Sequence, residues 1–117
     1  MNILIVDGDD GVRDSLNCFI ESEGHQCQTA RNGKEALKLL GDHTPNIIIA
    51  DIDMPEMSGI ELFSNVHSDH PEKKIDMLLI TGGDHYNDFR GNGTNSKFSI
   101  IKKPINPAEI RKLLSPA

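Results

Sequence analysis

Carboxylates, a hydroxyl group and a lysine stand at chain positions from which they could jointly handle a phosphoryl group and a metal ion. Asp7 follows the apolar run that opens the chain, Asp51 and Asp53 follow a later run, and Thr81 and Lys103 follow two more. Neighbouring carboxylates repel one another unless a hard cation such as Mg²⁺ bridges them, and Mg²⁺ prefers oxygen ligands. A carboxylate can also attack a phosphoryl group, whose oxygens then need positive charge and hydrogen-bond donors.

The elements that must position these side chains are strands alternating with helices, which is the pattern of a parallel sheet covered by helices. The predicted strands are Ile3–Val6, Gln26–Thr29, Asn46–Ala50, Ile75–Ile80 and Phe98–Ile101. In the flavodoxin-like order 2-1-3-4-5, the first and third strands are neighbours, and ligands bind beyond their carboxyl ends. We therefore expect Asp7 and Asp51 side by side, with Thr81 and Lys103 approaching from the far side.

Helices are indicated between the strands by apolar spacing and by end signals. Apolar residues recur at helical spacing from Val12 to Ile20, and Gly24 stands where that helix would end. Capping boxes are predicted at Asn32 with Glu35 and at Ser58 with Glu61, and a last helix opens at Asn106-Pro107. Between Gly82 and Ser96 the apolar stripe is poor, which predicts a short, frayed or mobile fourth helix. We expect one (βα)5 domain over residues 1–117, with no output domain in this chain.

Composition narrows the class of protein. The chain has 117 residues, 37% hydrophobic and 26% charged, which is typical of one globular domain. The formal net charge of −6 argues against direct nucleic-acid binding. No apolar run is long enough to cross a membrane, and the N-terminus does not resemble a signal peptide. Cys18 and Cys27 show no pairing or metal-ligand spacing, so we expect reduced thiols and a cytoplasmic location.

The whole chain resembles the receiver domains of two-component response regulators. The resemblance rests on residues 2–7, on residues 32–37, on the run from Asp51 to Gly59 and on Lys103-Pro104, in this order and at these separations. It implies that Asp51 is the phosphoacceptor, that Thr81 and Lys103 contact the phosphoryl group, and that Lys103–Pro104 is a cis peptide bond. It also implies a site for Mg²⁺ or Mn²⁺, held by the carboxylates of Asp7 and Asp51 and by the backbone carbonyl of Asp53.

Two residues depart from the family pattern. Receivers carry a second acid directly after the first, but position 8 is Gly8; either Asp9 turns in as a metal ligand or a water takes that place. We expect weaker metal affinity as a result. At the switch position, where receivers place Tyr or Phe, this chain has Ile100, whose branched side chain cannot swing a ring. One hypothesis is that the activation signal travels instead through ordering of the fourth helix.

The resemblance implies a signalling switch rather than an enzyme, one that catalyses only its own phosphorylation and dephosphorylation. A sensor histidine kinase or a phosphotransfer protein would phosphorylate Asp51, and the face made by the fourth helix, fifth strand and last helix would then change its downstream partner. Gly8 and Ile100 motivate an alternative, a receiver-like binding module that does not use phosphorylation. Asp51-x-Asp53 also resembles the nucleophile pair of haloacid-dehalogenase-like phosphatases, but this chain has no residues to spare for their cap domain.

Overall fold

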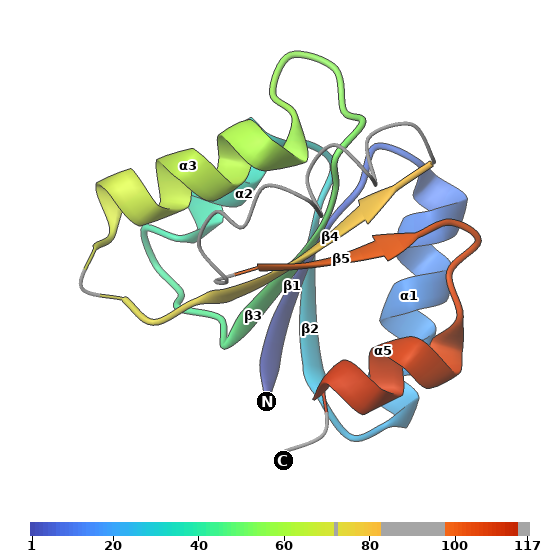
Figure 1. Ribbon diagram of the computed structural model, residues 1–117. Helices are drawn as coiled ribbons and strands as arrows, with labels where there is room; N and C mark the ends of the chain where they lie inside the picture. The colour runs from blue at the N-terminus through green and yellow to red at the C-terminus, as the bar shows by residue number, and fades with distance from the viewer. Residues whose placement is uncertain (72, 83–97, 115–117) are drawn as a thin grey trace.

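The protein forms a five-stranded parallel sheet with helices on both of its faces. We describe residues 1–71, 73–82 and 98–114 of a computed structural model, in which the strand order is β2-β1-β3-β4-β5, as predicted. In the view of Figure 1, α2 and α3 cover one face of the sheet, and α1 and α5 cover the other. The predicted fourth helix falls on residues that lie outside this description.

Each predicted strand is present, and the four after the first run one residue further than the apolar runs suggest. The strands are β1 (Asn2–Val6), β2 (Gln26–Ala30), β3 (Ile47–Asp51), β4 (Asp76–Thr81) and β5 (Phe98–Lys102). Asp51 pairs with Ile80 in the sheet, and Thr81 pairs with Lys102. Polar residues at strand ends can take part in sheet pairing because the pairing uses backbone groups. The candidate Asp51 and Thr81 are therefore held by the sheet itself rather than by the loops that follow it.

The helices begin and end close to the predicted signals. They are α1 (Asp10–Ser22), α2 (Gly33–Leu39), α3 (Gly59–Asp69) and α5 (Pro107–Leu114). Ser58 and Glu61 form the reciprocal capping box, and Gly24 follows α1 with a φ of 91°. Asn32 accepts the amide of Glu35 as predicted, but the Glu35 carboxylate accepts the amide of Arg31 rather than that of Asn32. In the capping box predicted at Asn32, the return hydrogen bond of Glu35 is thus shifted by one residue.

Two apolar layers pack on the sheet because successive side chains of a strand point to opposite faces. In β1, Ile3 and Ile5 pack with residues of α1 and α5, whereas Leu4 and Val6 pack with residues of α2 and α3. Every residue of β3 is buried. This two-sided burial explains the nearly continuous apolar runs in the sequence and makes the sheet a rigid base for the residues at its carboxyl edge. Within the described residues, no helix combines the length and the apolar character needed to cross a membrane.

Candidate functional site

The predicted site residues gather at the carboxyl edge of the sheet, where β1, β3 and β4 end. Asp7, Asp51 and Thr81 are the buried polar residues among those described, with 2%, 6% and 0% of their surfaces exposed. Val6 pairs with Ala50 in the sheet, so the next residues along the two strands, Asp7 and Asp51, are neighbours. The predicted meeting of Asp7 and Asp51 is therefore confirmed.

Both oxygens of the Asp51 carboxylate have partners. Oδ1 accepts a hydrogen bond from the backbone N–H of Asp53 at 3.0 Å, and Oδ2 lies 3.3 Å from Nζ of Lys103. Lys103 is held in place because its backbone N–H donates to the carbonyl of Thr81 at 2.8 Å. The Lys103–Pro104 peptide bond is cis, as expected. The structure therefore brings together Asp51 at the end of β3, Thr81 at the end of β4 and Lys103 directly after β5.

The two carboxylate oxygens of Asp7 differ in their hydrogen bonding. Oδ1 accepts the backbone N–H of Asp9 at 2.8 Å, whereas the buried Oδ2 has no hydrogen-bond partner in the described part of the chain. Burial raises the pKa of the Asp7 carboxyl; the Asp9 N–H opposes this shift, the charge of Asp51 adds to it, and the charge of Lys103 opposes it. A buried carboxylate oxygen without a donor is costly in the folded protein. A bound cation would remove that cost.

The hydroxyl of Thr81 is a second buried polar group at the site. Its Oγ1 is buried and has no hydrogen-bond partner among the residues that the structure describes. A hydroxyl can both donate and accept, so this group is suited to a ligand oxygen arriving at the site. The buried Oδ2 of Asp7 and the Oγ1 of Thr81 are the polar side-chain atoms left unsatisfied within the described part of the chain.

These atoms fit an oxygen-liganded cation, although the carboxylates are few. Over residues 1–71, 73–82 and 98–114, no three His, Cys, Asp or Glu side chains cluster as a metal site by themselves. Asp7 and Asp51 supply two carboxylates, and the backbone carbonyl of Asp53 lies in the segment that follows. Magnesium keeps several waters and needs only one or two carboxylates, so this set suits Mg²⁺ better than a metal that requires a full protein cage.

Gly8 and Asp9 explain why the site offers few carboxylate ligands for a metal ion. The Asp9 side chain caps α1, accepting the amides of Gly11 at 2.8 Å and Val12 at 3.1 Å through Oδ1. A role of Asp9 as a metal ligand would have to compete with this cap. At Gly8 a Cβ would lie 3.8 Å from the carbonyl oxygen of Arg31, an ordinary van der Waals distance, and the backbone does not have the positive φ that favours glycine. The glycine is therefore not required by local geometry.

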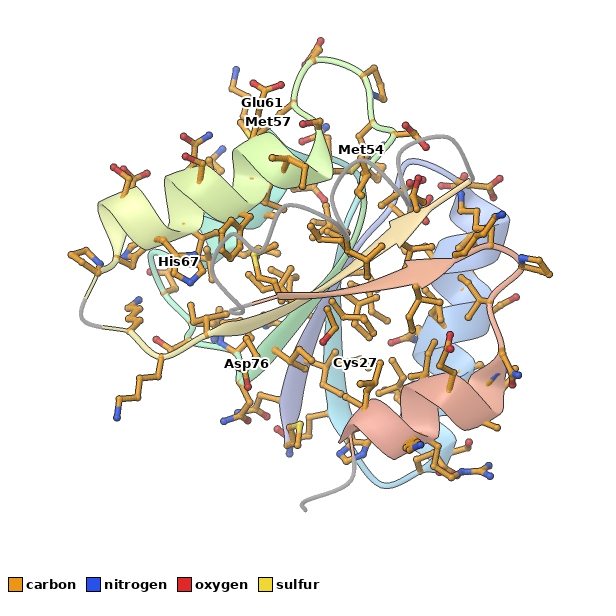
Figure 2. All side chains as sticks on the ribbon, in the orientation of Figure 1. Cys27, Met54, Met57, Glu61, His67 and Asp76 are labelled. Atoms are coloured by element: carbon orange, nitrogen blue, oxygen red, sulfur yellow. The ribbon has the colours of Figure 1, made fainter. Side chains whose placement is uncertain are left out.

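The segment between β3 and α3 is tied closely to the site. A Cβ at Gly59 would lie 2.7 Å from the carbonyl oxygen of Asp51, so only glycine lets α3 start this close to the strand. Met57, labelled in Figure 2, packs over the start of α2, where a Cβ at Gly33 would lie 2.5 Å from its Sδ. Met54 from the same segment is buried in the core. These contacts keep the Asp53 region next to Asp51.

Sequence reasoning missed one residue at the site. Arg13 of α1 donates from Nη1 to the backbone carbonyl of Asp7 at 2.8 Å and forms an ion pair with Asp10. An arginine in the first turns of a helix carries no signal that it will turn back to the preceding strand.

The switch position, Ile100, is half-buried and packs against the core layer that contains Leu79.

Comparison with known proteins agrees with this geometry. The family model described as "Response regulator receiver domain" matches residues 3–115. The chain is 32% identical, over 97% of its length and 87% of the relative, to a 14.6 kDa protein in the sodA1 3′ region of Leptolyngbya boryana. It is 28% identical to response regulator Rre1 of Synechocystis over 97% of this chain, but it spans only 50% of that relative.

A solved structure has the same fold. The chemotaxis protein CheY4 of Vibrio cholerae matches with a TM-score of 0.85 and 26% identity, covering 97% of this chain and 94% of that one. The family match, the strand order and the arrangement of Asp7, Asp51, Thr81 and Lys103 lead to one assignment. The chain belongs to the response regulator receiver domains of two-component signal transduction systems.

Proposed function

We propose that this receiver domain is a phosphorylation-dependent switch in which Asp51 accepts a phosphoryl group from a histidine kinase or a phosphotransfer protein. The observation that carries the proposal is the position of Lys103 Nζ, 3.3 Å from Oδ2 of a nearly buried Asp51. An ammonium group at this distance can pair with phosphoryl oxygens as charge develops on them. The alternative, a binding module without phosphorylation, gives no reason for this constellation.

In the proposed reaction, a carboxylate oxygen of Asp51 attacks the phosphorus atom of the donor. The bond from phosphorus to the donor's leaving atom breaks, and its electron pair leaves with the donor. Lys103 loses its partner on Asp51 and pairs with an oxygen of the transferred group. The hydroxyl of Thr81, which has no hydrogen-bond partner within residues 1–71, 73–82 and 98–114, donates to another oxygen. Mg²⁺ or Mn²⁺, held by Asp7, Asp51 and the Asp53 carbonyl, would neutralise negative charge on the phosphoryl group.

A groove beside the site supports a protein as the phosphoryl donor. The groove has a volume of about 610 Å³ and lies between α1 and the segment after β5. Its lining combines Lys103 with apolar side chains, among them Val12, Leu16, Phe19 and Ile105. Apolar surface next to a reactive polar centre is typical of a place where a partner excludes water during transfer.

The state of Asp51 would be read by a downstream protein or an output domain. Thr81 and Lys102 are paired in the sheet, so a movement of Thr81 toward the phosphoryl group would strain the end of β5. Ile100, two residues before Lys102, packs against the core layer beneath α2 and α3, so this strain would reach the surface of β5 on that side of the sheet. Receiver domains act in two-component systems with histidine kinases and output domains, which fits both proposed partner classes.

The proposal is tested with a small phosphodonor such as acetyl phosphate and Mg²⁺, using intact-mass measurement of the protein. We expect the mass of one phosphoryl group to be added to the native chain and not to Asp51→Asn. The adduct should survive acid and be lost in base, as an acyl phosphate is. Absence of the adduct at saturating Mg²⁺, in a protein that is folded by circular dichroism, would instead favour the phosphorylation-independent module.

A further inference from the structure

Arg13 connects helix α1 to the backbone of the candidate metal ligand Asp7. Its guanidinium donates from Nη1 to the Asp7 carbonyl at 2.8 Å and from Nη2 to the carboxylate of Asp10. Only 12% of the Arg13 side chain is exposed, whereas 80% of the Asp10 side chain is. The planar guanidinium, with five donors in a fixed fork, can hold a carbonyl and a carboxylate at the same time, which an ammonium cannot do with the same geometry.

The backbone from Asp7 to Asp9, which Arg13 contacts, needs a hydrogen bond from another element to hold its conformation. Gly8 directly follows the Asp7 carbonyl, and a glycine leaves the backbone on its side free to rotate. That rotation would turn the Asp7 carbonyl and would change the direction of the Asp9 N–H that holds Oδ1 at 2.8 Å. The direction of the other oxygen, Oδ2, which is buried without a hydrogen-bond partner among the described residues, depends on both contacts. Arg13 holds the first of them and the capping of α1 by Asp9 holds the second.

We propose that Arg13 is a positioning residue for the metal site: by anchoring the Asp7 carbonyl beside Gly8, it aims Asp7 Oδ2 at the cation. This inference rests on the proposed function, because it assumes that Asp7 binds the metal. Arg13 does not touch the metal or the phosphoryl group. Its effect is therefore on metal affinity, through the orientation of Asp7.

A purely electrostatic role of Arg13 predicts the opposite result. Arg13 is a cation near a cation site, so removing its charge without moving Asp7 would strengthen metal binding. A positioning role predicts weaker binding when the carbonyl anchor is lost, even if the positive charge is kept. The sign of the change in affinity thus separates the two roles.

The experiment measures the dissociation constant for Mn²⁺ by electron paramagnetic resonance on the metal-free, folded protein. Asp7→Asn defines the loss caused by removing the ligand itself. We expect Arg13→Ala and Arg13→Lys each to raise the dissociation constant about tenfold, the usual size of an outer-sphere contribution. Arg31→Ala is the charge control, since the Arg31 side chain is 72% exposed and pairs with Glu35 rather than Asp7. We expect it to leave Mn²⁺ affinity unchanged or slightly higher.

Two further measurements separate positioning from general stability. Urea unfolding gives the folded fraction of each variant, and the rate of phosphorylation is measured against metal concentration. We expect the half-saturating concentration to rise for Arg13→Lys, while the rate at saturating metal stays near that of the native chain. If Arg13→Ala does not fold, Arg13→Lys and Asp10→Asn carry the test, and the second should show a smaller loss because the Asp7 contact remains.

The outcomes are distinct. Mn²⁺ binding by Arg13→Lys that equals or exceeds that of the native chain overturns the inference and leaves the proposed function intact. If the native chain shows no Mn²⁺ binding that depends on Asp7, the metal step of the proposed function and this inference both fall. Weaker binding by Arg13→Lys, with unchanged binding by Arg31→Ala, supports the inference.

Discussion

Nζ of Lys103 lies 3.3 Å from Oδ2 of Asp51, although the two residues are 52 positions apart in the chain. The Asp51 side chain is 8% exposed and the Lys103 side chain is 36% exposed, so the lysine spans from the surface to the buried carboxylate. Lys102 is the last residue of β5 and is exposed. This pair of adjacent lysines allows a direct test of position against charge.

Replacing Lys103 by alanine should slow phosphorylation from a small phosphodonor by roughly a hundredfold, the usual loss when one charge-stabilising donor is removed. Lys102→Ala carries the same change in net charge and should stay within about twofold, since an exposed charge is screened by solvent. Initial rates at saturating Mg²⁺ give the comparison. Equal rates for the two variants would contradict the role given to Lys103.

Asp7→Asn should make the metal-free protein more stable at neutral pH, by about 1 kcal/mol, because it removes a buried and partly unsatisfied charge. Burial raises the pKa of Asp7 above its ordinary value of 3.8, so the folded protein binds this proton more tightly than the unfolded chain does. That contribution to stability is complete below the unfolded pKa and is lost as pH rises through the folded pKa. The difference in unfolding free energy between Asp7→Asn and the native chain should therefore grow with pH.

Urea unfolding in EDTA at a series of pH values measures this difference. Adding Mg²⁺ at ten times its dissociation constant should stabilise the native chain by about 1.4 kcal/mol and should have little effect on Asp7→Asn. A difference that does not change with pH would show that Asp7 is not the titrating group.

Gly8→Asp should strengthen Mg²⁺ binding by roughly tenfold, because it adds a carboxylate to a site that has few. The described residues leave room for the substitution, since a Cβ at this position would lie 3.8 Å from the Arg31 carbonyl oxygen. In the absence of metal, the added charge should repel Asp7 and Asp51 and lower stability by about 1 kcal/mol. Gly8→Asn has nearly the same shape without the charge and should show neither effect. Equal Mg²⁺ affinities for the Asp and Asn variants, measured by calorimetry, would contradict the idea that the missing carboxylate at position 8 limits metal affinity.

Thr81→Val should leave the unphosphorylated protein at least as stable as the native chain, with a gain of up to about 1 kcal/mol. Among the described residues the buried Oγ1 has no hydrogen-bond partner, so its loss removes a desolvation cost without breaking a contact there. Phosphorylation should nevertheless slow by about tenfold, because the hydroxyl is lost to the transferred group. Thr81→Ser keeps the hydroxyl and should retain most of the rate. A destabilisation of more than about 1 kcal/mol by Thr81→Val would mean that the hydroxyl has a structural partner in solution.

The sequence alone was sufficient for the strand order, for the placement of most helix ends and for the set of residues at the site. Apolar runs, helical spacing and capping residues are local signals, and they also imply which residues follow each strand. The resemblance to receiver domains then assigned a role to each of Asp7, Asp51, Thr81 and Lys103. Their meeting at one edge of the sheet is confirmed; their roles in phosphorylation remain predictions.

Only the tertiary structure decided how those residues are held. The sequence did not reveal that Arg13 reaches back to the Asp7 carbonyl or that Asp9 caps α1. Nor did it reveal that one Asp7 oxygen has no hydrogen-bond partner in the part of the chain that the structure describes. It also placed Asp51 just after its strand, whereas β3 includes Asp51 in the sheet. Such features depend on the distances between side chains and backbone groups of different elements, which the packing of helices against the sheet determines. A local pattern predicts which elements form, but the hydrogen bonds made across elements exist only once the chain is folded.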